Sequence, residues 1–203
     1  MGATGQSGSA RINLEKAVVL VVDSNTQGQE IIVQIVTGFG VKAIHRADST
    51  REAVGKLQRQ AIDLIIADAN LDDGEFDGYD FVHWLRRSGM EPNAFTPVIM
   101  TSGHTSAHGV AKARDCGANI VVVKPLSPAA LLQRIMWVAR EKRLFVDAGV
   151  YVGPDRRFKN QGPPPGTKGR RSTDLSENIG AAVESNLSQE ELDDLVSPQK
   201  AAP

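Results

Sequence analysis

Five short apolar runs, rich in valine and isoleucine, recur along the first 145 residues of the chain. The runs are Ala17–Val22, Val41–His45, Leu64–Ala67, Val98–Thr101 and Ile120–Val123. Their apolar residues are nearly continuous, which is typical of strands covered on both faces. Segments in which apolar residues recur at helical spacing follow each run. Five strand–helix units in series predict an α/β fold with a five-stranded, doubly wound parallel sheet.

Polar residues follow four of the five runs directly: Asp23, Asp68, Ser102 and Lys124. Doubly wound sheets bind ligands at the carboxyl ends of their strands, so we expect these side chains to converge. Mg²⁺ prefers oxygen ligands, here the carboxylates of Asp23 and Asp68 and the backbone carbonyl of Asn70. A carboxylate can form an aspartyl-phosphate, while Lys124 pairs with a phosphoryl oxygen and Ser102 donates a hydrogen bond to another. Taken singly, each aspartate could instead be only a helix N-cap.

Longer motifs surround these residues. They are Val21-Val22-Asp23, Asp63 to Asn70, Asp77-Gly78, Pro97 to Gly103, Gly117-Ala118-Asn119 and Val123-Lys124-Pro125. Together they resemble the receiver domain of two-component response regulators, the CheY-like family with a flavodoxin-like fold, over about residues 14–143.

The resemblance implies a role for each residue. Asp68 would accept a phosphoryl group from a histidine kinase or phosphotransfer protein, with Mg²⁺ as cofactor. Asp23 would belong to the acidic metal pocket, Ser102 would be the switch hydroxyl, and Lys124 would pair with the phosphate and precede a cis bond to Pro125. We expect a bacterial, cytoplasmic phosphoprotein that is no enzyme beyond its own phosphotransfer and dephosphorylation.

The chain departs from the family pattern at several positions. Ser24 stands where the family usually has a second acid, which is expected to weaken metal binding. Asp72 replaces a proline after the phosphoacceptor, and the longer loop adds Asp73 and Glu75. Val121 occupies the place of the aromatic switch residue. The usual coupling between a hydroxyl and an aromatic ring is therefore expected to be absent or altered.

Composition divides the chain into four parts. We predict a flexible N-terminus over residues 1–13, a receiver domain over 14–145, a linker rich in proline, glycine and arginine over 146–171, and a largely disordered acidic tail over 172–203. Residues 151–171 carry six basic residues and one acidic residue, whereas 172–203 carry one basic and seven acidic residues. Arginine pairs at 156–157 and 170–171 could bind an anionic ligand, although a solvated linker is the simpler interpretation.

The tail contains one segment with a helix signal, Leu187–Val196. Ser188 and Glu191 fit a capping box, and Leu192 and Leu195 then share one helix face. The segment resembles the receiver-binding N-terminal peptide of the flagellar switch protein FliM. It could dock in cis or on another receiver, or be a short amphipathic helix without a partner.

Two functions remain open at this point. The first is a phosphorylation switch whose output is contact with a protein, because the tail is too short and too rich in proline and glycine for a DNA-binding domain. A target of the chemotaxis or flagellar type and another receiver are the candidate partners. The second is a receiver-fold binding module that works without phosphorylation, through its tail. The single cysteine, Cys116, excludes an internal disulfide framework. No apolar run has the length of a membrane span.

Overall fold

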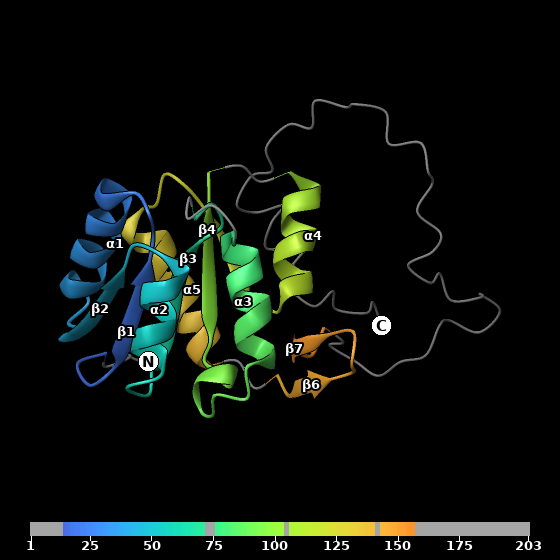
Figure 1. Cartoon of the computed structure of the whole chain (residues 1–203). Helices are drawn as coiled ribbons and strands as arrows, with labels where there is room; N and C mark the ends of the chain where they lie inside the picture. The colour runs from blue at the N-terminus through green and yellow to red at the C-terminus, as the bar shows by residue number, and fades with distance from the viewer. Residues whose placement is uncertain (1–13, 72–75, 104–105, 141–142, 157–203) are drawn as a thin grey trace, which may run out of the picture.

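The computed structural model describes residues 14–71, 76–103, 106–140 and 143–156. The elements are β1 (Val18–Val22), α1 (Thr26–Gly38), β2 (Ala43–Ala47), α2 (Thr50–Leu57), β3 (Leu64–Asp68), α3 (Gly78–Arg87), the 3₁₀ helix η1 (Asn93–Phe95), β4 (Val98–Ser102), α4 (Ala107–Cys116), β5 (Ile120–Val123), α5 (Pro128–Arg140), β6 (Phe145–Asp147) and β7 (Val152–Pro154). Strands β1 to β5 form one parallel sheet in the order β2-β1-β3-β4-β5 (Figure 1). The predicted fold class is confirmed.

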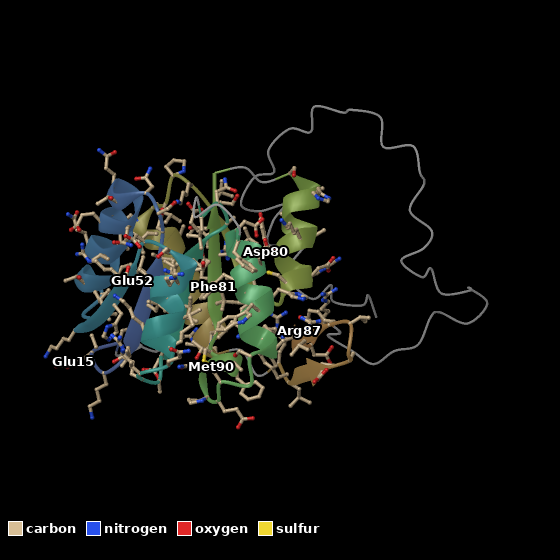
Figure 2. All side chains as sticks on the ribbon, in the orientation of Figure 1. Glu15, Glu52, Asp80, Phe81, Arg87 and Met90 are labelled. Atoms are coloured by element: carbon tan, nitrogen blue, oxygen red, sulfur yellow. The ribbon has the colours of Figure 1, made fainter. Side chains whose placement is uncertain are left out.

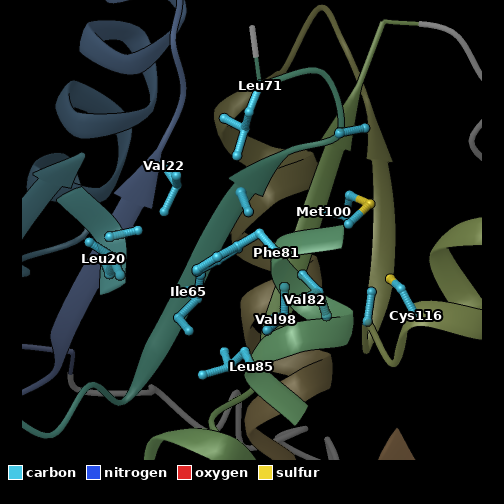
Figure 3. Close-up of a cluster of buried hydrophobic side chains, with 14 of the residues drawn as sticks. Leu20, Val22, Ile65, Leu71, Phe81, Val82, Leu85, Val98, Met100 and Cys116 are labelled. Carbon is cyan, nitrogen blue, oxygen red and sulfur yellow. The ribbon is translucent and has the colours of Figure 1, made fainter. Parts of the chain in front are cut away.

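Helices cover both faces of this sheet, and each face has its own apolar core. Leu20 and Val22 of β1 point into the core beneath α2, α3 and α4, whereas Val19 and Val21 point into the core beneath α1 and α5. Figure 3 shows the first of these cores, with Phe81 of α3 lying among side chains of the sheet. Burial on both faces explains why the strands read as continuous apolar runs.

Side-chain caps fix where the helices begin. The Asn25 side chain accepts hydrogen bonds from the first backbone N–H groups of α1. Ser49 and Ser106 cap α2 and α4 in the same way. Asp77 and Asp80 form a reciprocal capping box at the start of α3. These caps set the helix starts close to the carboxyl edge of the sheet, where the predicted site residues lie.

A small antiparallel hairpin, β6–β7, follows α5 and corrects the predicted domain boundary. The predicted linker from residue 146 is wrong for residues 146–154, because Val146 pairs with Gly153 and Asp147 pairs with Val152. The hairpin packs on the C-terminal end of α3. Arg87 donates hydrogen bonds to the carbonyls of Gly149 and Val150, at 3.3 and 2.9 Å. Figure 2 shows Arg87 at the end of α3 beside the hairpin.

The last described residues also contact the domain that contains the parallel sheet. The Arg156 guanidinium lies 2.7 Å from Asp115 of α4 and 3.6 Å from the centroid of the Tyr151 ring. Arg156 is therefore engaged in structural contacts, contrary to its predicted place in a flexible linker. Its neighbour Arg157, the other arginine pair and the segment Leu187–Val196 lie outside the described residues. Among the described helices, none combines the length and the apolar character that crossing a membrane requires.

Candidate functional site

The carboxyl ends of the central strands bring the predicted site residues together. Asp68 is the last residue of β3, Ser102 is the last of β4, and Asp23 and Lys124 directly follow β1 and β5. The registers place Asp68 beside Thr101 and Ser102 beside Val123. Residues far apart in the sequence thus meet at one edge of the sheet, as predicted.

Lys124 bridges the two aspartates at the centre of the site. Its Nζ donates to Asp68 Oδ2 at 2.7 Å and to Asp23 Oδ2 at 2.9 Å. Asp23 and Asp68 are only 1% and 7% exposed. Burial opposes the charge of the Lys124 ammonium, but its hydrogen bonds with Asp68 and Asp23 outweigh this, so its pKa is raised. At neutral pH the site therefore contains a charged lysine that spans the two carboxyl groups.

Backbone and amide contacts hold Asp23 in place. The Asn25 N–H donates to Asp23 Oδ1 at 2.8 Å, which leaves Oδ2 to Lys124. Gln29 of α1 is buried, and its Nε2 donates to the carbonyls of Asp23 and Ala47 at 3.2 and 2.9 Å. Gln29 belongs to no motif of the sequence. Its signal is its place in the first turn of the helix that follows Asp23.

Two glycines let helices approach the site closely. A Cβ atom on Gly28 of α1 would lie 2.9 Å from Asp23 Oδ2 and 3.6 Å from Lys124 Nζ. A Cβ atom on Gly78 would overlap the carbonyl oxygen of Asp68. The Asp77-Gly78 motif therefore has a steric cause, because only glycine lets α3 begin against the carbonyl of Asp68.

A family model described as the response regulator receiver domain matches residues 19–136. The chain belongs to this receiver family.

Similar proteins agree with this assignment. The phosphate regulon transcriptional regulatory protein PhoB of Escherichia coli (strain K12) is 28% identical over 122 residues, which are 60% of this chain and 51% of PhoB. The chain thus spans about half the length of the curated relatives it matches. The chemotaxis protein CheY4 of Vibrio cholerae is 30% identical with a TM-score of 0.55, over 60% of this chain and 98% of CheY4.

A third match supports the fold alone. The CheY-like receiver domain protein from Methanospirillum hungatei JF-1 is 22% identical with a TM-score of 0.53, over 60% of this chain and 91% of that protein.

The donor set of this receiver domain is suited to a hard cation. Asp23 and Asp68 present carboxylate oxygens within reach of a single Lys124 nitrogen, and the Asn70 carbonyl lies two residues beyond Asp68. Mg²⁺ is usually held by one or two carboxylates together with waters and phosphate oxygens, so these residues fit it. Ser24 offers a hydroxyl in place of a carboxylate. No group of three or more acidic, histidine or cysteine side chains occurs at this site or elsewhere in the described ranges.

Two predicted positions on β4 and β5 are buried. Val121 lies in the core beneath α2, α3 and α4, and Ser102 is the last residue of β4. Lys124–Pro125 is a cis peptide bond, as predicted.

Proposed function

We propose that this receiver domain accepts a phosphoryl group on Asp68 and acts as a phosphorylation-dependent switch in two-component signalling. The observation that carries the proposal is the pair of buried carboxylates joined by Lys124, at 2.7 and 2.9 Å. A half-buried lysine between two buried aspartates contributes little net stability on its own, because desolvation offsets the attraction between the charges. Such an arrangement instead points to a chemical role.

The chemistry follows from the positions of the side chains. An oxygen of the Asp68 carboxylate forms a bond to phosphorus, and the bond from phosphorus to the imidazole nitrogen of the donor breaks. Lys124 is placed to transfer its hydrogen bond from Asp68 to a phosphoryl oxygen, and Ser102 at the neighbouring strand end is placed to donate to another. Bound Mg²⁺, held by Asp23, Asp68 and the Asn70 carbonyl, would supply positive charge opposite the phosphoryl oxygens.

Input and output both involve proteins in this proposal. The donor is a histidine kinase or a phosphotransfer protein, and the output is contact with a downstream protein of the chemotaxis or flagellar type, or with another receiver. Ser188, Glu191, Leu192 and Leu195, which would form the partner-binding peptide, stay a prediction from the sequence, and so does an anionic ligand at the arginine pairs.

The test is phosphorylation of the full-length protein by acetyl phosphate and Mg²⁺, followed by intact-protein mass spectrometry. We expect wild type to gain one phosphoryl group and Asp68→Asn to gain none. Asp48→Asn is the matched control, because Asp48 follows β2 at the same edge of the sheet but is exposed. It should be modified as wild type is, and a chelator should prevent modification of both.

Two results would contradict the proposal. One is a wild-type protein that gains no phosphoryl group while it remains folded, which would favour the binding module that works without phosphorylation. The other is equal modification of wild type and Asp68→Asn, which would move the acceptor to another residue.

A further inference from the structure

A pocket with a volume of about 550 Å³ lies between α2 and α3. These two helices cover the same face of the parallel sheet (Figure 1). The pocket is lined by side chains of both helices and by Phe76, which precedes α3. Asp23, Asp68 and Lys124 do not line it. The pocket is therefore separate from the candidate phosphorylation site.

The interior of the pocket is apolar and mostly aromatic. Phe81 of α3 is 2% exposed and belongs to the core, whereas Val54 of α2 is half-buried. Phe76 and Trp84 are 49% and 37% exposed. In the described ranges, six large apolar side chains are exposed, and two of them line this pocket. Aromatic side chains in a concave site offer faces on which a planar ring system can stack.

The α2 side of the pocket is polar and positively charged. Ser49 is the N-cap of α2, Thr50 and Arg51 are its first two residues, and all three line the pocket. Among the described lining residues, Arg51 has the one charged side chain. Partial positive charge on the backbone N–H groups at the start of a helix adds to that of its guanidinium. This side of the pocket therefore favours an anionic group.

The carboxylates beside Arg51 in the sequence are engaged elsewhere. Glu52 accepts a hydrogen bond from Lys56 Nζ at 2.6 Å and another from the Asp48 N–H at 3.1 Å. Asp48 accepts a hydrogen bond from the Ser49 hydroxyl at 2.9 Å. Between residues that the structure describes, no ion pair involves the Arg51 guanidinium. Its charge is therefore available to a ligand in the pocket.

We propose that this pocket binds a small molecule that combines a planar aromatic ring system with an anionic group. The ring system stacks against Phe76 and Trp84 above Phe81, and the anionic group pairs with Arg51. The volume is suited to such a ligand, because small-molecule sites usually have volumes of about 300–1,000 Å³. The proposal goes beyond the proposed function and does not rest on it, since no residue of the phosphorylation site takes part.

The experiment titrates the full chain with 1-naphthaleneacetate and, separately, with its neutral amide, and follows the tryptophan indole N–H resonances by NMR. The chain has two tryptophans, and Trp137 of α5 packs against the core on the other face of the sheet, so it is an internal reference. We expect the Trp84 resonance to shift in a saturable way with either compound, while that of Trp137 stays constant.

The charge of the ligand is tested by comparing the two compounds. The acid should bind about two- to fivefold more tightly than the amide, because a solvent-exposed ion pair contributes only modestly to affinity. Salt at about 1 M should remove this difference by screening. Arg51→Gln should remove it too and leave the affinity for the amide unchanged. Arg59→Gln is the matched control, because Arg59 is an exposed arginine just after α2 that does not line the pocket.

The aromatic wall is tested by Phe76→Ala, which should weaken the binding of both compounds about two- to tenfold. Phe95→Ala is the matched control, because the Phe95 side chain is 48% exposed but lies on η1, outside the pocket. The inference would be overturned by three results. They are a Trp84 resonance that does not shift, equal wild-type affinities for acid and amide, and equal effects of a pocket variant and its control.

Discussion

At the scale of single residues, Gly78 is the glycine, among those in the described ranges, where an added Cβ atom would come closest to another atom. The Asp-Gly pair is visible in the sequence, but only the structure shows what the glycine does. The start of α3 lies directly against the Asp68 carbonyl, and the Gly78 N–H donates to the Ala69 carbonyl at 3.0 Å. A side chain at position 78 would displace either α3 or the segment that follows Asp68.

We therefore expect Gly78→Ala to lower the free energy of unfolding by about 1–3 kcal/mol, the usual cost of forcing extra atoms into a packed region. Gly55→Ala is the matched control, because Gly55 lies within α2 and a Cβ atom there would meet no atom within 4 Å. That substitution should stabilise the protein by about 0.5–1 kcal/mol, since alanine favours the helix. Urea unfolding measures the change in the free energy of unfolding for both variants. Changes of the same sign would contradict the steric role of Gly78.

The site residues differ in how far the sequence could predict them. Asp23, Asp68 and Lys124 were predictable because each directly follows an apolar run of the sequence, and parallel strands in a doubly wound sheet end at a common edge. Gln29 was not predictable in the same way. It lies on a helix, and the apolar pattern of a helix indicates which face is buried without stating which polar atom that face brings to the edge of the sheet.

At the scale of elements, Arg86 joins the C-terminal end of α3 to its neighbours. Its guanidinium donates to the carbonyls of Gly117, Ala94 and Thr96 and to Asn119 Oδ1, at 2.7 to 3.2 Å. The residue is 3% exposed, and this burial lowers its pKa to about 10. One side chain thus bonds to η1, to the residue that directly follows η1 and to the turn between α4 and β5.

Arg86→Met should reduce the free energy of unfolding by about 3 kcal/mol or more, because each buried acceptor left without a donor costs about 1–3 kcal/mol. The adjacent Arg87→Met is the matched control. Arg87 is exposed and bonds to the tip of the hairpin and, at 3.1 Å, to Nδ1 of the exposed His83, so its loss should cost about 1 kcal/mol or less. Chemical denaturation compares the two variants. Equal costs would show that burial of Arg86 adds nothing to stability.

The sequence pattern predicts the strands of the main sheet but not the hairpin. The five strands of the main sheet were predictable because burial on both faces makes their sequences continuously apolar. The hairpin was missed because β6 and β7 have three residues each, and β7 reads Val-Gly-Pro, which is typical of a loop. The hairpin nevertheless requires Gly153. This residue packs against Gly117, and a Cβ atom on it would lie 2.9 Å from the Gly117 Cα.

At the scale of the whole molecule, the hairpin extends the receiver domain beyond the region that its family model matches, which ends at residue 136. It packs on the end of α3 that lies opposite Asp68, since Gly78 begins the helix beside Asp68 and Arg87 ends it at the hairpin. Asp115 of α4 holds Arg156. Helix α4 therefore contacts Tyr79 near the site, through Lys112, and, at its other end, the segment that leads into the tail.

Phe145 is the side chain that we expect to hold the hairpin in place. Its ring makes an edge-to-face contact with Phe95 at 5.0 Å, and the Arg86 guanidinium lies 5.0 Å from its centroid. Phe145→Ala should therefore release the hairpin while the parallel sheet stays folded. An aromatic pair is worth about 0.5–1.5 kcal/mol, so amide hydrogen exchange in the hairpin should become up to about tenfold faster.

The amides to follow are those of Ala148 and Asp155, which donate to the carbonyls of Tyr151 and Leu144. Leu144→Ala is the matched control, because Leu144 precedes Phe145 but is 77% exposed. It should leave these exchange rates close to wild type, and strand β3 should exchange at the wild-type rate in both variants. Unchanged hairpin exchange in Phe145→Ala would mean that the arginine and backbone contacts alone hold the hairpin. Release of the hairpin in that variant would establish that the segment leading into the tail is docked through a few aromatic and arginine contacts, which a partner protein could exchange for its own.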